Sequence, residues 1–324
     1  MLLPESRDPR PRRIDPLSVV LSSAGIVAVV HAVKRAAHDG ADQPDAWVAG
    51  ALGLAGLAWF AWRQGRLAQP LIDVRLFRRR AFSASIGTNL LAIFTMTAMS
   101  LIFAWYFQLV LGWSPLQAGL AGLPGGLSGA VGGFLAARLI GPLGRNGVVA
   151  LGLLLNAGAF LFYGSLGQDP SYLPIMVAML AGGLGIGLAF TVNNDNVLAT
   201  APRERAGAAA AVSETSFELG GALGIAVLGS VLTAAYSENL RVPEGVPAEA
   251  ARESLAGAMR LAAALPPEQA TALLGAARAA FVEGVRVTGR VTAGLLAVAA
   301  VLALVGLRGV PKVIPDEVLS GARS

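Results

Sequence analysis

The sequence predicts an all-α polytopic membrane protein with about eight transmembrane helices. Hydrophobic residues make up 55% of the 324 residues and charged residues only 14%, and the mean hydropathy is +0.62. Soluble domains carry about 25% charged residues, so this balance is typical of a chain that lies largely in a bilayer. The 40 glycines fit the same class, because small residues let membrane helices approach closely.

Windows of about 20 mostly apolar residues, the length that crosses a bilayer, mark the spans in chain order. The predicted spans are residues 17–33, 46–62, 83–111, 116–139, 148–166, 173–193, 206–236 and 291–307. Arginines cluster before the first span, after the second and after the last, for example at Arg10, Arg78 and Arg308. Because basic loops stay on the inner side, we expect a multi-pass plasma-membrane protein with both termini in the cytoplasm.

Two connecting segments carry patterns of their own. Residues 65–80 are basic and amphipathic, which indicates either a helix along the inner membrane surface or a plain positive-inside loop. Residues 237–282 are predicted to form an external loop of two helices, interrupted at Pro266 and Pro267. Packing of this hairpin on the membrane rim is favoured over a lid above the exit.

The residue inventory excludes several kinds of chemistry. The sequence has no cysteine, and its two histidines, His31 and His38, have no partner nearby, so thiol chemistry and zinc or haem sites are not expected. The spans carry no nucleophile–base pair, so we do not expect an enzyme. The isoelectric point of about 10.2 is explained by arginines at the ends of spans, and nucleic acid is not an expected partner.

Two glutamates, Glu214 and Glu218, lie in the otherwise uncharged stretch 206–236. One helical turn separates them, so both side chains leave the same face, about 13 and 19 Å from Arg205 at the inner interface. A carboxylate in hydrocarbon costs at least about 2.5 kcal/mol, so the pair indicates a proton or cation path. Because two nearby acids repel and the bilayer disfavours ionisation, at least one is expected to hold a proton near neutral pH. The alternative is a pair of permanently protonated structural acids.

Other polar groups and glycines complete the candidate set. Asn89 and Gln108 lie in the third span, and Asp195 follows the sixth, where it either lines a cytoplasmic cavity or caps the helix in water. Glycines at four-residue spacing predict faces for close helix crossings. The glycines of these predicted crossings are Gly122, Gly126, Gly129, Gly133, Gly220 and Gly224.

Several short motifs and one longer stretch carry a family resemblance. The short motifs are Leu3-Pro4-Glu5-Ser6-Arg7-Asp8-Pro9, Pro70-Leu71-Ile72-Asp73, Ser114-Pro115 with Gln117-Ala118-Gly119-Leu120, and Leu123-Pro124. The longer stretch is Glu214-Thr215, followed by Glu218-Leu219-Gly220-Gly221-Ala222-Leu223-Gly224-Ile225-Ala226-Val227-Leu228-Gly229-Ser230. In these residues the chain resembles the C-terminal part of the fourteen-helix drug:proton antiporters of the major facilitator superfamily, of the quaternary-ammonium-resistance type.

The resemblance implies an organisation and an activity. Residues 1–82 would hold a cytoplasmic N-terminal segment, an extra central helix pair and the basic inner segment. Residues 83–324 would form a C-terminal six-helix bundle that includes the external loop. The implied activity is proton-coupled export of hydrophobic cationic drugs or similar small molecules, with protons as the coupling ion and no other cofactor. Glu214 and Glu218 would serve cation recognition and proton coupling.

The resemblance also implies an N-terminal six-helix bundle that the sequence does not contain. We therefore expect a fragment, a truncated product, or a half-transporter that assembles in the lipid bilayer with a separate N-terminal half or a second copy. A transporter of this kind binds its substrate between two halves. The alternative from another class is an accessory or structural membrane subunit without transport, which would tolerate loss of the two glutamates.

Overall fold

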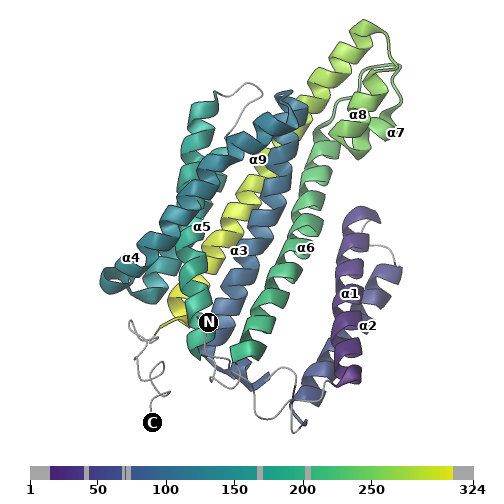
Figure 1. The fold of residues 1–324 in the computed structure, drawn as a ribbon. Coiled ribbons are helices and arrows are strands. Elements are labelled where there is room, and N and C mark those ends of the chain that lie inside the picture. The colour runs from purple at the N-terminus through teal and green to yellow at the C-terminus, as the bar shows by residue number, and fades with distance from the viewer. Residues whose placement is uncertain are drawn as a thin grey trace, which may run out of the picture. The chain divides into compact units, whose positions relative to one another are not determined.

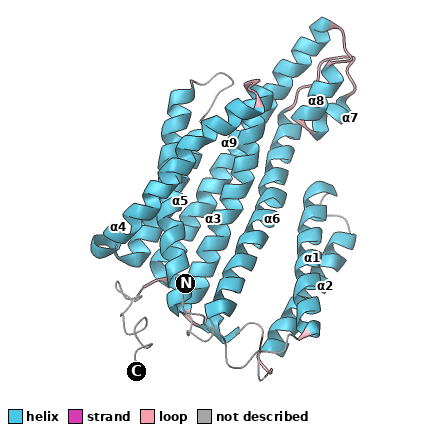
Figure 2. Ribbon diagram, in the orientation of Figure 1, coloured by secondary structure: helices cyan, strands magenta, loops and turns pink. Residues whose placement is uncertain are grey.

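The computed structural model describes residues 15–39, 44–67, 70, 74–165, 171–200 and 206–308. Every regular element in these residues is a helix, so the all-α prediction is confirmed (Figure 2). The chain divides into two compact units, residues 1–76 and 77–324. Within the second unit, Phe77 packs edge-on against Phe82 with ring centroids 5.3 Å apart. The predicted organisation, with its boundary after residue 82, stays a prediction.

The first unit is a helical hairpin of α1 (Pro16–Asp39) and α2 (Pro44–Gln64), which cover the first two predicted spans. The helices approach closely where glycine leaves room, since a Cβ at Gly53 would lie 2.8 Å from the Val29 nitrogen. Of the basic segment 65–80 after α2, residues 65–67, 70 and 74–80 are described, and they include the short 3₁₀ turn η1 (Val74–Arg78). The predicted position of this segment on the inner membrane surface stays a prediction.

A polar network joins the start of α1 to the end of α2. Arg63 Nη2 lies 2.9 Å from Asp15 Oδ2, and Ser18 donates a 2.6 Å hydrogen bond to the same carboxylate oxygen. Gln64 in turn donates to the Ser18 hydroxyl over 2.7 Å. These bonds lower the pKa of Asp15 from 3.8, the Ser18 hydrogen bond most, followed by the hydrogen bond and charge of Arg63.

We expect Asp15→Asn to loosen this junction, because the amide cannot pair with the Arg63 guanidinium. A carboxylate with a lowered pKa stabilises the fold above its unfolded pKa and loses that contribution as the pH falls through the folded value. The protection of backbone amides in the first turn of α1, measured relative to the intrinsic exchange rate at each pH, should therefore fall in the wild type only below pH 3.8. The variant should exchange fast already at neutral pH, and equal protection of both proteins at neutral pH would contradict the expectation.

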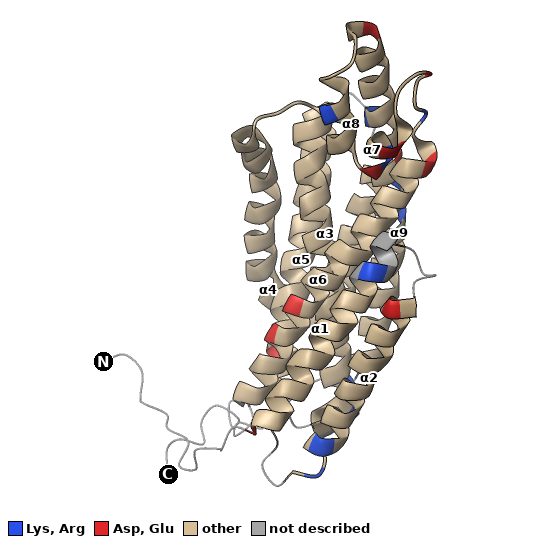
Figure 3. Cartoon of the chain, turned by 90° about the vertical axis from the view of Figure 1, so that its right-hand side faces the viewer, with Lys and Arg blue, Asp and Glu red and all other residues tan. Residues whose placement is uncertain are grey.

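The second unit is built on five long helices: α3 (Arg80–Trp105), α4 (Pro115–Tyr163), α5 (Tyr172–Thr200), α6 (Ala206–Asn239) and α9 (Pro267–Gly306). The short helices α7 (Ala248–Glu253) and α8 (Leu255–Ala262) stand beyond the end of α6 (Figure 1). Charged residues are sparse along the long helices other than α9 (Figure 3). Together with the first unit, seven described helices are long and apolar enough to cross a membrane.

Helix α4 contains two of the predicted spans. Its 49 residues would extend about 73 Å as one straight helix, more than twice a hydrocarbon core of about 30 Å. Gly144 breaks it with φ 72° and ψ 166°, a backbone conformation that glycine adopts without steric cost. The two arms of α4, before and after Gly144, therefore correspond to the predicted spans 116–139 and 148–166.

Helix α5 packs against both arms of α4 through glycines on two of its sides. A Cβ at Gly187 would overlap the Gly129 carbonyl of the first arm, and a Cβ at Gly185 would overlap the Gly152 carbonyl of the second. Such backbone-to-backbone approach is what small residues permit in membrane bundles. Helix α5 therefore packs closely against both arms of α4 and holds the two arms together.

The last helix is longer than predicted. The sequence placed a short span at 291–307 after a separate external helix, but α9 is one continuous helix of 40 residues. The charges that lower its hydropathy near the middle do not break it, because Arg286 donates to Glu283 one turn away, with 2.6 Å between Nη1 and Oε2. The second helix of the predicted external loop is therefore the first part of α9.

Candidate functional site

Helix α6 presents two carboxylates on one side. Glu214 and Glu218 are both exposed on the chain, within the candidate membrane span 207–239. Neither has an ion-pair partner among the described residues. Successive helical residues turn by about 100°, so Gly220 points nearly opposite to Glu218. On that other side a Cβ at Gly220 would lie 2.7 Å from the Leu90 carbonyl of α3. The glycine that packs against α3 and the two exposed glutamates therefore lie on different faces of α6.

An aromatic pair flanks the acids. Phe217 lies between them in sequence and packs against Phe190 of α5, with ring centroids 5.3 Å apart. Both phenylalanines are half-buried, so each keeps part of its ring exposed. A carboxylate pair beside partly exposed aromatic rings can hold an organic cation through charge and ring contacts.

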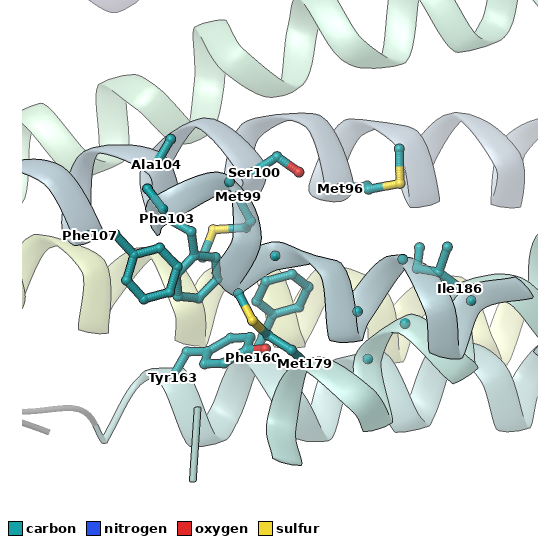
Figure 4. Close-up of a pocket in the computed structure, with 18 of the residues that line it drawn as sticks. Met96, Met99, Ser100, Phe103, Ala104, Phe107, Phe160, Tyr163, Met179 and Ile186 are labelled. Atoms are coloured by element: carbon teal, nitrogen blue, oxygen red, sulfur yellow. The ribbon is translucent and has the colours of Figure 1, made fainter. Parts of the chain in front are cut away.

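A cavity of about 620 Å³ lies among α3, both arms of α4 and α5. Figure 4 shows Phe103, Phe107, Phe160, Tyr163 and Met179 gathered at one end, with Met96 and Ile186 toward the other. Drug-binding pockets have volumes of about 300–1,000 Å³ and mostly apolar walls with a few polar groups. This cavity has both properties, since its few polar lining groups include Gln108 and Asn156.

The C-terminal end of α3 contributes to one side of this cavity. The helix ends in a π-helical turn, η2 (Tyr106–Val110), which supplies Phe107 and Gln108 to the cavity. Such turns are frequent at functional sites, and apolar periodicity gives no signal for them. Trp113 then stacks on Phe107 with ring centroids 5.0 Å apart.

Ser114 starts α4 in a reciprocal capping box with Gln117, which fixes where the first arm begins.

The structure does not bring all predicted site residues together. Gln108 lines the cavity, whereas Glu214, Glu218, Asn89 and Asp195 do not. Asn89 is fully buried, and neither atom of its side-chain amide has a hydrogen-bond partner among the described residues. Asp195 lies within α5, five residues before its last residue, rather than at a helix end, and its side chain is 55% exposed.

Asp195 belongs to a cluster that the sequence did not predict. Arg145 follows the break at Gly144, is buried, and donates a 2.9 Å hydrogen bond to Asn196 Oδ1. Its Nη1 also lies 3.9 Å from Asp195 Oδ2. Arg145 and Asn196 are 51 residues apart, so only the fold joins them. This contact ties the break in α4 to the C-terminal part of α5.

We expect Arg145→Ala to destabilise the second unit by about 1–3 kcal/mol, because it removes a buried charged donor from the Asn196 amide. The measurement is the thermal unfolding midpoint of purified protein in detergent. Arg138→Ala is the matched control, since Arg138 lies on the same helix but is exposed. Equal midpoints for the two variants would contradict the structural role of Arg145.

The predicted glycine crossings differ in what they contact. Gly220 and Gly224 lie at the crossing with α3, and Gly129 lies near α5, where a built Cβ would be 3.4 Å from the Gly183 carbonyl. A Cβ at Gly133 would be 3.1 Å from the Thr191 hydroxyl. Gly122 and Gly126 do not lie at a crossing with the described residues, because a Cβ at either would have no neighbour within 4 Å. Both border the cavity instead.

Fold and site together define a multi-pass helical membrane protein with an acid-bearing face and a drug-sized cavity. The family model described as the Major Facilitator Superfamily matches residues 17–225. The chain belongs to this superfamily.

Three relatives illustrate the similarity. "Multidrug efflux pump LfrA" of Mycolicibacterium smegmatis is 40% identical over 310 residues, which are 95% of this chain and 61% of that protein. "Methyl viologen resistance protein SmvA" of Salmonella typhimurium is 34% identical over 66% of this chain and 44% of its own length. "Tetracenomycin C resistance and export protein" of Streptomyces glaucescens is 28% identical over 79% and 48%. The chain thus spans about half of the length of these relatives.

Proposed function

We propose that this chain forms the C-terminal bundle of a proton-coupled exporter of hydrophobic cationic drugs or similar small molecules. The observation that carries the proposal is the pair Glu214 and Glu218, exposed on one face of a membrane-spanning helix without a partner among the described residues. Each carboxylate would cost at least about 2.5 kcal/mol against lipid. A face that carries two of them is better explained as the wall of a polar path.

The two carboxyl groups on such a wall would exchange a proton for a cation. A carboxyl group in a poorly solvated site favours its protonated form, and an approaching cation favours the carboxylate. Binding of a cationic drug at Glu214 and Glu218 would therefore release a proton, and protonation would release the drug. Phe190 and Phe217 would add ring contacts to the cation. The proton is the coupling ion of this scheme, and no other cofactor is needed.

The opposite wall of the path would come from a second bundle. Transporters of this kind bind substrate between two halves and expose it alternately to the two sides by rocking. We propose that the acid face of α6 meets such a second six-helix bundle, from the same protein or another chain. In a fourteen-helix arrangement of the quaternary-ammonium-resistance type, α1 and α2 would be the extra central pair. The protein would lie in the plasma membrane with both termini cytoplasmic.

The names of the relatives support export of drugs as the activity. One is named for multidrug efflux, one for methyl viologen resistance, and one for resistance to and export of tetracenomycin C. The match with the first covers nearly the whole of this chain, including α6.

The test is efflux of ethidium, a fluorescent cationic dye, from cells that express this chain alone or with the unmatched part of the 40%-identical relative. Co-purification would establish that the two parts assemble. We expect extrusion from the assembled pair that collapses on adding an uncoupler. Extrusion that persists with the uncoupler would contradict proton coupling. No extrusion by an assembled, membrane-inserted pair would favour an accessory subunit without transport.

A further inference from the structure

A second cavity, of about 200 Å³, lies where α7 and α8 meet the ends of α3 and α6 and the first part of α9. Figure 1 shows α7 and α8 at this end of the second unit. We call it the α7 cavity, and its lining includes Trp105, Thr233, Tyr236, Glu253, Ala256 and Phe281. It shares no lining residue with the 620 Å³ cavity, so the two are separate.

Packed contacts hold α7 and α8 in place beside this cavity. Tyr236 of α6 is buried, and its hydroxyl donates a 2.8 Å hydrogen bond to the Ala251 carbonyl of α7. Ser254 caps α8 by accepting a 3.0 Å hydrogen bond from the Gly257 nitrogen. A Cβ at Gly257 would lie 2.5 Å from the Ala250 carbonyl, so α8 packs closely on α7. Packed helices, and not a free loop, therefore bound the α7 cavity.

One carboxylate gives this cavity its charge. Glu253, the last residue of α7, is the only charged residue among the described residues that line it. Its side chain is exposed and has no ion-pair partner within the part of the chain that the structure describes. Glu253 also lines an open groove along α7, together with Glu249 and Arg252, so it lies where the cavity meets the surface. A cation can therefore reach it from solvent.

The rest of the lining is aromatic and apolar. Trp105 is 39% exposed, and the tryptophan ring gives the strongest cation–π contact of the aromatic side chains. Leu232 and Phe281 are buried and add apolar surface. A hydrated metal ion would meet one carboxylate among apolar groups, whereas an alkylated ammonium ion matches both. The volume is below the 300–1,000 Å³ typical of drug pockets, so a small group fits best.

We propose that the α7 cavity binds the ammonium group of a small organic cation, with Glu253 supplying the opposite charge and Trp105 a ring contact. A free ion and a lipid headgroup present the same alkylated nitrogen, so both belong to this ligand class. The site goes beyond the proposed function. Thr233 follows Glu218 by 15 residues on α6, about 22 Å along the helix, so the acid face does not reach the α7 cavity.

The test reads the tryptophans by ¹⁹F NMR. The full chain is labelled with 5-fluorotryptophan and placed in nanodiscs of phosphatidylglycerol, whose headgroup carries no ammonium group. Trp105→Phe identifies the Trp105 resonance among those of the five tryptophans. Titrations use choline and 3,3-dimethylbutan-1-ol, which have the same shape except that carbon replaces the charged nitrogen.

The variants separate charge from shape. We expect choline to shift the Trp105 resonance saturably and the uncharged alcohol to bind at least about tenfold more weakly. Glu253→Gln should weaken choline binding at least about tenfold. Glu249→Gln is the matched control and should stay within about twofold, because Glu249 lines the groove but not the cavity. Ala256→Leu should weaken binding by filling the cavity. The other tryptophan resonances show whether each variant is folded.

Adding phosphatidylcholine to the nanodiscs separates the two sources of the ammonium group. Weaker choline binding would assign the site to a lipid headgroup, and unchanged binding would assign it to a free ion.

Three outcomes would overturn the inference. Equal affinity for choline and the alcohol, or choline binding that is unchanged by Glu253→Gln, would mean that no carboxylate selects the ligand. An equal shift of Trp59, which is exposed on α2, would mean general partition at the lipid surface. Glu218→Gln should leave the Trp105 titration unchanged. Loss of ethidium export with intact choline binding would therefore fail the proposed function and not the α7 cavity.

Discussion

Replacing Glu218 with Gln is expected to lower uncoupler-sensitive ethidium export at least about tenfold, since a carboxylate about 4 Å from a cation can contribute several kcal/mol in a poorly solvated site. Glutamine keeps the length of the side chain and most of its hydrogen bonding, but it can neither ionise nor release a proton. Glu218 is exposed on α6 and has no ion-pair partner among the described residues, so the substitution breaks no contact that holds the bundle. The loss should therefore appear in transport and not in expression or thermal stability.

Glu238→Gln is the matched control for this prediction. Glu238 lies on the same helix and is also exposed, but it is next to the last residue of α6 and follows the otherwise uncharged stretch 206–236. The same chemical change at that position should leave export within about twofold of wild type, since exposed surface charges contribute little. Equal export by Glu218→Gln and Glu238→Gln, at equal protein levels, would remove Glu218 from the proton and cation path.

Replacing Gly187 with Leu is expected to give the largest loss of stability, about 3 kcal/mol, because overpacking a close helix crossing forces backbones apart. A Cβ at Gly187 would overlap the Gly129 carbonyl and would also lie 3.0 Å from the Gly133 nitrogen. Since α5 holds both arms of α4, separation at this crossing should also disturb the cavity. The measurement is the thermal unfolding midpoint in detergent, together with the fraction of monodisperse protein.

Gly294→Leu provides the control for side-chain size and lipid contact. Gly294 lies on α9, is exposed, and has no atom within 4 Å of a built Cβ. Leucine there should leave the midpoint unchanged or raise it, because leucine favours the helix more than glycine does. A Gly187→Leu protein as stable as Gly294→Leu would mean that α5 and α4 are not in backbone contact.

Features that depend on local pattern could be predicted from the sequence. Apolar windows located the long helices because crossing a bilayer needs a minimum apolar length. The four-residue spacing of Gly220 and Gly224 likewise indicated a packing face, and both lie against α3 in the structure. The carboxylates of Glu214 and Glu218 stood out because charge is rare in such a stretch.

Features that depend on long-range packing could not be predicted. The cavity is formed by helices separated in the chain, and nothing near Gly122 in sequence distinguishes a glycine that borders a cavity from one at a crossing. The Arg145–Asn196 contact needs the break at Gly144 and the return of α5. The long α9 was missed because Glu283 and Arg286 lower the local hydropathy, although their pairing within the helix lets it continue.

We propose that Glu214 and Glu218 exchange a proton for a cationic drug. This exchange can be measured as proton release when ethidium is added to the purified, assembled transporter in weakly buffered detergent solution at neutral pH. We predict that the wild type releases protons in proportion to bound dye and that the double variant Glu214→Gln/Glu218→Gln releases none. Dye binding without proton release in the wild type, or equal release by the double variant, would contradict the claim.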